Sequence, residues 1–170
     1  MRLLTTDRLE LKHTEITDAL FLLELYNTPK WIQYIGDRHI KTVDDASQYI
    51  KERLLPQIEK SGFGNYIIRY EGKPVGVCGL YDRPELEGVD LGFALHPDYE
   101  GRGFAIESAR ALMAMAWEEY SFDKISAITL EVNTSSIQVL QKLGFSFLKK
   151  VRFQEDAEEL LLYEALSKNN

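Results

Sequence analysis

The spacing of apolar residues along the chain alternates between two periods. Apolar residues at every second position are typical of a strand, and apolar residues at every third or fourth position are typical of a helix. The period of two predicts an edge strand over residues 8–12. Helical spacing then predicts a helix over residues 19–26 that packs Leu20 and Leu23 inward.

A second helix is predicted from Thr42, whose hydroxyl suits an N-cap. Acidic residues in the following first turn favour the same helix start, because they complement the helix dipole. The pattern continues to about Leu55, where Pro56 is expected to kink or end the helix.

The second half of the chain reads as a meander of strands followed by a crossover. A helix over 103–118 joins the strand predicted over 89–95 to the one predicted over 124–132. A right-handed crossover of this kind makes those two strands parallel. A short helix over 136–143 ends at Gly144. The strands are predicted over 62–70, 75–81, 89–95 and 124–132, followed by a hairpin of 145–153 with 159–163.

These elements predict a sheet of six to seven strands, antiparallel except for one parallel pair and flanked by helices. The fold class is therefore α+β, or mixed α/β. No internal repeat, low-complexity tract or linker interrupts the pattern, so residues 1–170 are expected to form a single domain.

Composition narrows the choice of partners and compartment. Hydrophobic residues make up 45% of the chain, and its net charge of -7 argues against nucleic acid or an anionic membrane as partner. No apolar window approaches the ~20 residues of a membrane span, and the first residues lack an apolar h-region, so we expect neither a membrane span nor a secretory leader. The lone cysteine, Cys78, excludes an internal disulfide and is expected to be inert core. We expect a cytoplasmic protein.

No metal is expected. The three histidines, His13, His39 and His96, have neither metal-site spacing nor a partner cysteine.

The most informative stretch is Glu100-Gly101-Arg102-Gly103, between the strand 89–95 and the long helix. Such a turn directs several backbone N–H groups and the positive end of the helix dipole at one point, which is an anion site. The two glycines allow a phosphate to approach the backbone, and Arg102 adds a guanidinium. Taken alone, the turn is also compatible with a tight connection that binds nothing.

A second motif lies downstream, where residues 133–145 read N-T-S-S-I-Q-V-L-Q-K-L-G-F. The glycine-rich turn followed by this N-x-x-S-…-K-L-G-F run resembles the GNAT superfamily of acyl-CoA-dependent N-acetyltransferases. Residues 4–11, L-T-T-D-R-L-E-L, are similar to the L-x-T-x-R-L-x-L start of its ribosomal-protein N-terminal acetyltransferase (RimJ/RimL-type) branch. The resemblance covers nearly the whole chain.

This resemblance implies a cleft between two splayed parallel strands, with acetyl-CoA as cosubstrate. Backbone N–H groups of 101–106 would hold the pyrophosphate, and the edge of 93–95 would bind pantetheine amides if a bulge frees it. Glu100 departs from the Arg, Gln or aromatic residue usual in the family, so we predict that its side chain points outward. The expected coenzyme-binding residues are Phe93, Ala94, Leu95, Gly101, Arg102, Gly103, Phe104, Ala105, Ile106, Asn133 and Ser136.

The acceptor amine must lose a proton before it attacks, because amines are mostly protonated at neutral pH. A carboxylate can take that proton directly or through water. Asp90 lies on the central strand, where the resembled branch often carries Glu. Glu131 would share a face with Asn133 on an extended chain. We favour Asp90 over Glu131, and either residue could instead be an ordinary hydrogen-bonded or solvated carboxylate.

The departing thiolate can use a proton donor. Many superfamily members have Tyr at the position of Leu140, which cannot donate, so Ser136 is the nearest substitute. Ser136 could equally serve as the N-cap of the short helix, and Asn133 could be a turn residue. Candidate walls of an acceptor pocket are Trp31, Tyr34 and Tyr81, with the loops around Pro84 and Gln154. Core packing is the other possibility for each aromatic residue.

The favoured function is an acetyl-CoA-dependent N-acetyltransferase that acts by direct attack in a ternary complex. The acceptor could be a protein N-terminus, an amino acid, a polyamine or an antibiotic amine. The alternatives are a non-catalytic acyl-CoA-binding sensor or scaffold and a nucleotide-binding protein that uses the same turn. Sequence alone leaves open the acceptor, acetyl against longer acyl donors, and monomer against homodimer.

Overall fold

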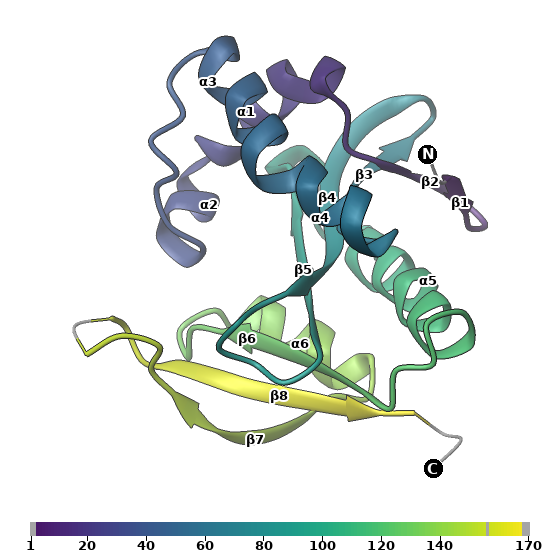
Figure 1. Cartoon of the computed structure of the whole chain (residues 1–170), viewed down its shortest axis with the longest axis vertical. Coiled ribbons are helices and arrows are strands. Elements are labelled where there is room, and N and C mark those ends of the chain that lie inside the picture. The colour runs from purple at the N-terminus through teal and green to yellow at the C-terminus, as the bar shows by residue number, and fades with distance from the viewer. Residues whose placement is uncertain (1–2, 156, 168–170) are drawn as a thin grey trace.

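A computed structural model describes residues 3–155 and 157–167 of the chain. Strands in this part form one eight-stranded sheet in the order β1-β2-β3-β4-β5-β6-β8-β7 (Figure 1). The pair β5–β6 is parallel, and the other neighbouring pairs are antiparallel. The strands are β1 (Leu3–Thr5), β2 (Leu9–His13), β3 (Asn65–Tyr70), β4 (Lys73–Asp82), β5 (Val89–Leu95), β6 (Lys124–Thr129), β7 (Ser146–Val151) and β8 (Leu160–Leu166).

Helices cover both faces of the sheet, and none in the described ranges is long and apolar enough to cross a bilayer. The α-helices are α1 (Ala19–Tyr26), α2 (Pro29–Tyr34), α3 (Val43–Tyr49), α4 (Leu55–Ser61), α5 (Phe104–Glu118) and α6 (Thr134–Lys142). Single turns are η1 (Ile16–Asp18), η2 (Ile50–Leu54, a π-helical turn) and η3 (Pro97–Tyr99).

Helix α5 packs on one face of the sheet because its inward residues are apolar or small. Leu112 and Ala116 of α5 are fully buried against Ile68 and Cys78 of β3 and β4. Leu140 of α6 extends the same core over the C-terminal strands.

Helices α1 to α4 gather on the opposite face, over β3, β4 and β5 (Figure 1). Ile67, Val77 and Ala94 contribute the sheet side of this second core. The layers therefore separate the even-numbered residues of β5, which face α1–α4, from the odd-numbered ones, which face α5.

The mixed sheet with a single parallel pair and flanking helices confirms the predicted fold class. The count of six to seven strands misses β1, whose three residues are too few to show alternation. The prediction that Leu20 packs inward is wrong, because that side chain is 57% exposed while Leu22 and Leu25 are buried.

Two predicted element ends are also wrong. Pro56 does not end the helix that begins after Thr42: the chain changes to the π-helical turn η2 just before the proline and continues as α4 to Ser61. The strand predicted to reach residue 132 stops at Thr129, and a turn follows it, with Asn133 N–H donating to Leu130 O at 3.0 Å.

Candidate active site

Strands β5 and β6 separate almost as soon as they meet. Their pairs are Val89 with Ile125 and Asp90 with Ser126. Beyond Asp90, no strand of residues 3–155 and 157–167 pairs with the β6-facing edge of β5. The register between β4 and β5 is continuous, so no bulge frees residues 93–95 as expected. The divergence of β6 frees their edge instead, and the predicted splay is present.

The turn after β5 has the geometry of an anion site. Gly101 and Gly103 have φ of 73° and 81°, which residues with a Cβ rarely adopt. Glu107 N–H makes the first helical bond of α5, to Gly103 O at 3.0 Å, so the preceding N–H groups of the helix start have no acceptor within the helix. A Cβ at Gly101 would meet nothing within 4 Å. The open approach to these donors fits a diphosphate.

The side chains of this turn point away from those donors. The guanidinium of Arg102 lies 5.2 Å from the centre of the Tyr99 ring and donates to Asp98 O at 3.2 Å. Glu100 pairs with Lys30 of α2, which agrees with its predicted outward direction. The Phe104 ring is buried in the core, so backbone groups rather than side chains present the anion site.

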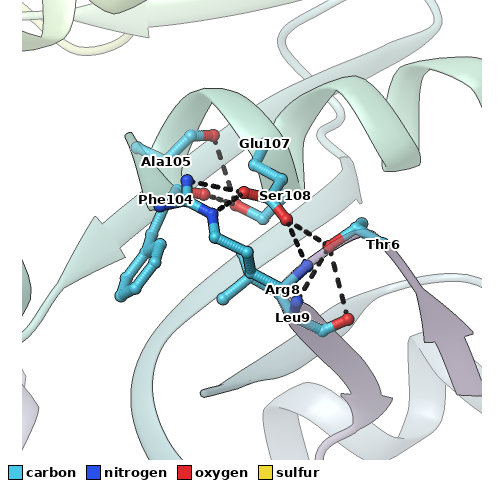
Figure 2. A network of polar contacts seen from close by, with 7 residues as sticks. All are labelled: Thr6, Arg8, Leu9, Phe104, Ala105, Glu107 and Ser108. Atoms are coloured by element: carbon cyan, nitrogen blue, oxygen red, sulfur yellow. Dashed lines mark hydrogen bonds and ion pairs between the residues drawn. The ribbon is translucent and has the colours of Figure 1, made fainter. Parts of the chain in front are cut away.

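A hydrogen-bond network fixes the start of α5 to the segment between β1 and β2. Figure 2 shows the Glu107 carboxylate reaching Thr6 and Arg8. It accepts from Thr6 Oγ1 at 2.6 Å, from Arg8 N at 2.9 Å and from Arg8 Nε at 2.7 Å. Burial alone would raise the pKa of Glu107, but these hydrogen bonds outweigh it and hold that pKa below its ordinary value.

The Arg8 guanidinium also borders the turn itself. A Cβ added to Gly103 would lie 3.4 Å from Arg8 Nη2. The Arg8 guanidinium carbon, Cζ, lies 4.8 Å from the centre of the Phe104 ring. The network therefore neutralises a carboxylate one helical turn from the anion site and braces the backbone that forms it.

Asp90 is a buried carboxylate at the vertex of the two diverging strands. Its residue is 1% exposed, and Arg83 Nε donates to Oδ1 at 2.7 Å. Within residues 3–155 and 157–167, Oδ2 forms no hydrogen bond. Burial raises the pKa of Asp90 from 3.8 to about 6, against the lowering effect of Arg83. A carboxyl of this kind is ionised at neutral pH and close to the pKa that suits a general base.

Tyr81 forms the aromatic surface beside Asp90, to which it is paired across β4 and β5. Its ring covers Gly79 and Gly92, where an added Cβ would come within 2.7 Å and 2.9 Å of ring atoms. Tyr81 OH donates to Asn65 Oδ1 at 2.6 Å, which locks the ring flat along the sheet. The prediction that Tyr81 borders the site fits this position, whereas Trp31 stacks on Tyr26 in the core at 4.2 Å.

The structure does not bring Glu131 into this cluster. It lies in the turn after β6, where its side chain is 71% exposed and pairs with Lys150 at 3.2 Å. The expectation that it shares a strand face with Asn133 fails, because the chain turns there instead of remaining extended.

Asn133, and not Ser136, is the N-cap of α6. Asn133 Oδ1 accepts from Ser136 N at 3.3 Å and from Ser135 Oγ at 3.1 Å. The proposed capping role of Ser136 is therefore wrong, because α6 begins at Thr134, two residues earlier than predicted. The half-buried Ser136 hydroxyl forms no hydrogen bond within the described part of the chain, so it is available to a ligand.

A groove of about 490 Å³ runs along the helix-free face of β6, β8 and β7. Ser126 and Glu164, which pair across β6 and β8, lie on its floor. Glu85 and Glu87 of the β4–β5 loop form one wall, and Lys149 of β7 lines the other side. Because Ser126 also pairs with Asp90, the groove and the Asp90 carboxylate share one face of the sheet.

Comparison with known proteins decides the family. The model of the acetyltransferase (GNAT) domain matches residues 8–146. The chain belongs to the GNAT acetyltransferases. It is 26% identical over 166 residues to the uncharacterized N-acetyltransferase p20 of Bacillus licheniformis, covering 95% of this chain and 92% of that protein. It is 20% identical to the spermidine N(1)-acetyltransferase of Escherichia coli K12 over 81% of this chain and 72% of that enzyme.

The fold of this GNAT enzyme is shared with RimL, the ribosomal L7/L12 α-N-protein acetyltransferase, solved in complex with coenzyme A. The TM-score is 0.87 at 16% identity, and the alignment covers 99% of this chain and 100% of that one. This likeness shows a shared fold.

Three residues that contact the candidate site of this GNAT domain are not revealed by local sequence pattern. Arg83 lies in what reads as an ordinary polar turn, and only the hairpin register brings it to Asp90. Thr6 and Arg8 belong to the opening motif, but the motif does not reveal that they bind Glu107, about a hundred residues away.

Proposed function

We propose that this enzyme transfers an acetyl group from acetyl-CoA to a primary amine by direct attack in a ternary complex. The observation that carries the proposal is the buried Asp90 carboxylate at the vertex of the β5–β6 divergence, on a face that continues into a groove. The coenzyme can thus reach the Asp90 carboxylate along the free edge of β5, and the acceptor can reach it from the groove on the sheet face.

Coenzyme binding is assigned to backbone groups. The N–H groups at the start of α5, from Gly101 to Ile106, would hold the diphosphate, and the free edge of 93–95 would bind the pantetheine amides. Asn133 at the start of α6 and Ser136 complete this set. When bound, acetyl-CoA supplies an acetyl group activated as a thioester.

Asp90 is assigned the role of general base. In the structure Arg83 donates to its Oδ1, and the role assigned to the carboxylate is to accept a proton from the acceptor ammonium, directly or through one water. A carboxyl with a pKa near 6 is ionised at pH 7 yet more basic than an exposed aspartate. Glu131 lies exposed and ion-paired outside this cluster, so the same role is not assigned to it.

Ser136 is assigned a supporting role as proton donor to the departing sulfur. Its hydroxyl lies three residues after the N-cap of α6 and is not used in capping. A thiol with an ordinary pKa near 8.5 leaves as thiolate with modest assistance, so this contribution is smaller than that of Asp90.

The acceptor is assigned to the groove beside Ser126. Spermidine and ribosomal-protein N-termini, acceptors named for a relative and a fold neighbour, both present a primary amine. The groove carries acidic and basic side chains, among them Glu85, Glu164 and Lys149, which suits a polar acceptor.

Bisubstrate kinetics test the mechanism. Initial rates measured at several fixed acceptor concentrations should give intersecting double-reciprocal lines, because both substrates must be bound together. Parallel lines would indicate an acetylated enzyme intermediate and would contradict direct attack.

A further inference from the structure

Arg83 is the single charged group that touches the Asp90 carboxylate in the described part of the chain. It follows the last residue of β4 and belongs to the loop 83–88, whose Glu85 and Glu87 form a wall of the groove. Asp90 is held on β5 between two strands, with a side chain only 2% exposed, whereas that of Arg83 is 39% exposed. Arg83 is therefore the member of the pair that can leave.

The place that the guanidinium occupies has the chemistry of a cation site. Its carbon lies 5.9 Å from the centre of the Tyr81 ring while its Nε donates to Asp90 at 2.7 Å. A carboxylate beside an aromatic face is an arrangement that binds organic ammonium groups. An acceptor amine enters the site as such an ammonium group, since it is mostly protonated at neutral pH.

We propose, resting on the function assigned above, that Arg83 occupies the position at Asp90 where the acceptor ammonium binds, and that the acceptor enters by displacing it. Arg83 is then a specificity-determining residue. It keeps the buried carboxylate paired when no acceptor is present, and it selects acceptors whose cation competes with a guanidinium.

The charged and titratable groups near Asp90 come from four elements: the loop 83–88, β4, β6 and β8. Arg83 and Glu85 belong to the loop, and the Tyr81 hydroxyl belongs to β4. On β6 the neighbour is the uncharged Ser126, flanked by Lys124, whose Nζ lies 3.7 Å from Glu164 of β8. Removal of Arg83 takes away the positive charge that lowers the pKa of Asp90. The acidic limb of the pH profile of kcat/KM, which reports the free enzyme, should therefore move to higher pH.

Kinetics of Arg83→Ala and Arg83→Lys, with spermidine and an alanine-headed tripeptide amide as acceptors, give the first test. We expect Arg83→Ala to lower the acceptor KM about three- to tenfold at pH 8 while moving the acidic limb upward, as loss of one partly exposed ion pair permits. Arg83→Lys keeps a cation and should restore the position of the limb. Lys60→Ala, which removes a cation paired with the adjacent Asp82 at 3.8 Å, should change neither.

An acceptor KM that is unchanged or higher in Arg83→Ala would overturn the proposal. Asp90→Asn separates this from the assigned function. If that variant keeps full turnover while Arg83→Ala still lowers KM, Asp90 is not the base, but the displacement by the acceptor stands.

A direct measurement needs no turnover. The Arg83 Nε–H resonance, identified by its loss in Arg83→Lys, should be protected from solvent exchange in the free enzyme because it is bonded to Asp90. Addition of methylamine or spermidine should remove that protection. A resonance unchanged at the highest amine concentration would refute displacement.

Discussion

Asp90 of β5 and Ser126 of β6 form the second and last pair between the two parallel strands, and both residues are buried. Beyond this pair the strands diverge. The carboxylate therefore sits at the vertex of the opening, where burial raises its pKa to about 6. Its position links the coenzyme edge of β5 to the groove on the sheet face.

Replacing each candidate carboxylate separates the two bases. Asp90→Asn should lower kcat about a hundredfold or more, as expected for loss of a positioned base, with little effect on the Kd of CoA. Glu131→Gln is the matched control, because that side chain is exposed and pairs with Lys150, and should leave kcat near wild type. A larger loss in Glu131→Gln than in Asp90→Asn would reverse the assignment.

The pH dependence of unfolding tests the burial of the Asp90 charge. A native pKa of about 6 against an unfolded value near 3.8 means that the native state holds this proton more tightly. Ionisation of the buried carboxyl therefore destabilises the native state. This destabilisation is absent well below pH 3.8, grows as pH rises from 3.8 to about 6, and reaches its full size above pH 6. Relative to Asp90→Asn, wild type should therefore lose about 2–3 kcal/mol of unfolding free energy between pH 4 and pH 7. Parallel stability curves, measured by urea unfolding, would show that Asp90 is not desolvated.

Two glycines with the same backbone conformation test the anion site. Gly101 and Gly72 have φ of 73° and 75°, and an added Cβ on either meets nothing within 4 Å. Alanine at either position should cost roughly 1–2 kcal/mol of stability. Calorimetric titration should show CoA binding weakened about tenfold or more in Gly101→Ala alone, because the methyl group obstructs the amide donors. Equal CoA affinity in both variants would place the diphosphate elsewhere.

The Glu107 network predicts a coupling between stability and coenzyme binding. Glu107→Gln should lose about 2 kcal/mol, since three charge-assisted contacts to Thr6 and Arg8 are weakened. Because the native pKa of Glu107 is lowered, this difference should shrink as pH falls through that native pKa. Glu107→Gln should also raise the KM for acetyl-CoA, because the network braces the backbone of the anion site.

Glu52→Gln provides the control for that variant. It changes an exposed carboxylate of η2 that accepts from Gln48 Nε2 at 2.6 Å, on the face of the sheet opposite α5, and should alter neither quantity. A stability loss in Glu107→Gln with an unchanged acetyl-CoA KM would leave the network purely structural.

Adjacent serines of α6 separate capping from catalysis. Ser135 Oγ donates to the N-cap Asn133 at 3.1 Å, whereas the Ser136 hydroxyl is free of capping. Ser135→Ala should lower the melting temperature with little effect on kcat, and Ser136→Ala should lower kcat with little effect on melting. The reverse pattern would exclude Ser136 as proton donor.

Local pattern was enough to predict much of this molecule. Alternation and turn glycines located β3, β4 and β5, and the G-R-G turn was predicted at the start of α5, where Gly103 is the N-cap. Both depend on residues close together in the sequence, so periodicity and backbone preference reveal them.

The features that were missed depend on contacts between distant segments. The free edge of 93–95 arises from the course of β6, and the pairing of Arg83 with Asp90 arises from hairpin register and a loop conformation. Of the two roles predicted for Ser136, the capping role is wrong because Asn133, another good capping residue, begins the helix earlier. Residue type alone does not decide between two such candidates.

Amine-dependent release of free thiol from acetyl-CoA, with the acceptor product identified by mass, shows whether the protein transfers acetyl groups to amines. Wild type and Gly72→Ala should release thiol in proportion to an acetylated amine, with spermidine, amino acids and peptide N-termini as the acceptor panel. Gly101→Ala should lose this activity through weaker coenzyme binding, and Asp90→Asn should lose it while still binding CoA. Tight CoA binding by wild type without thiol release for any amine would contradict the assignment as an acetyltransferase and favour a non-catalytic acyl-CoA-binding module.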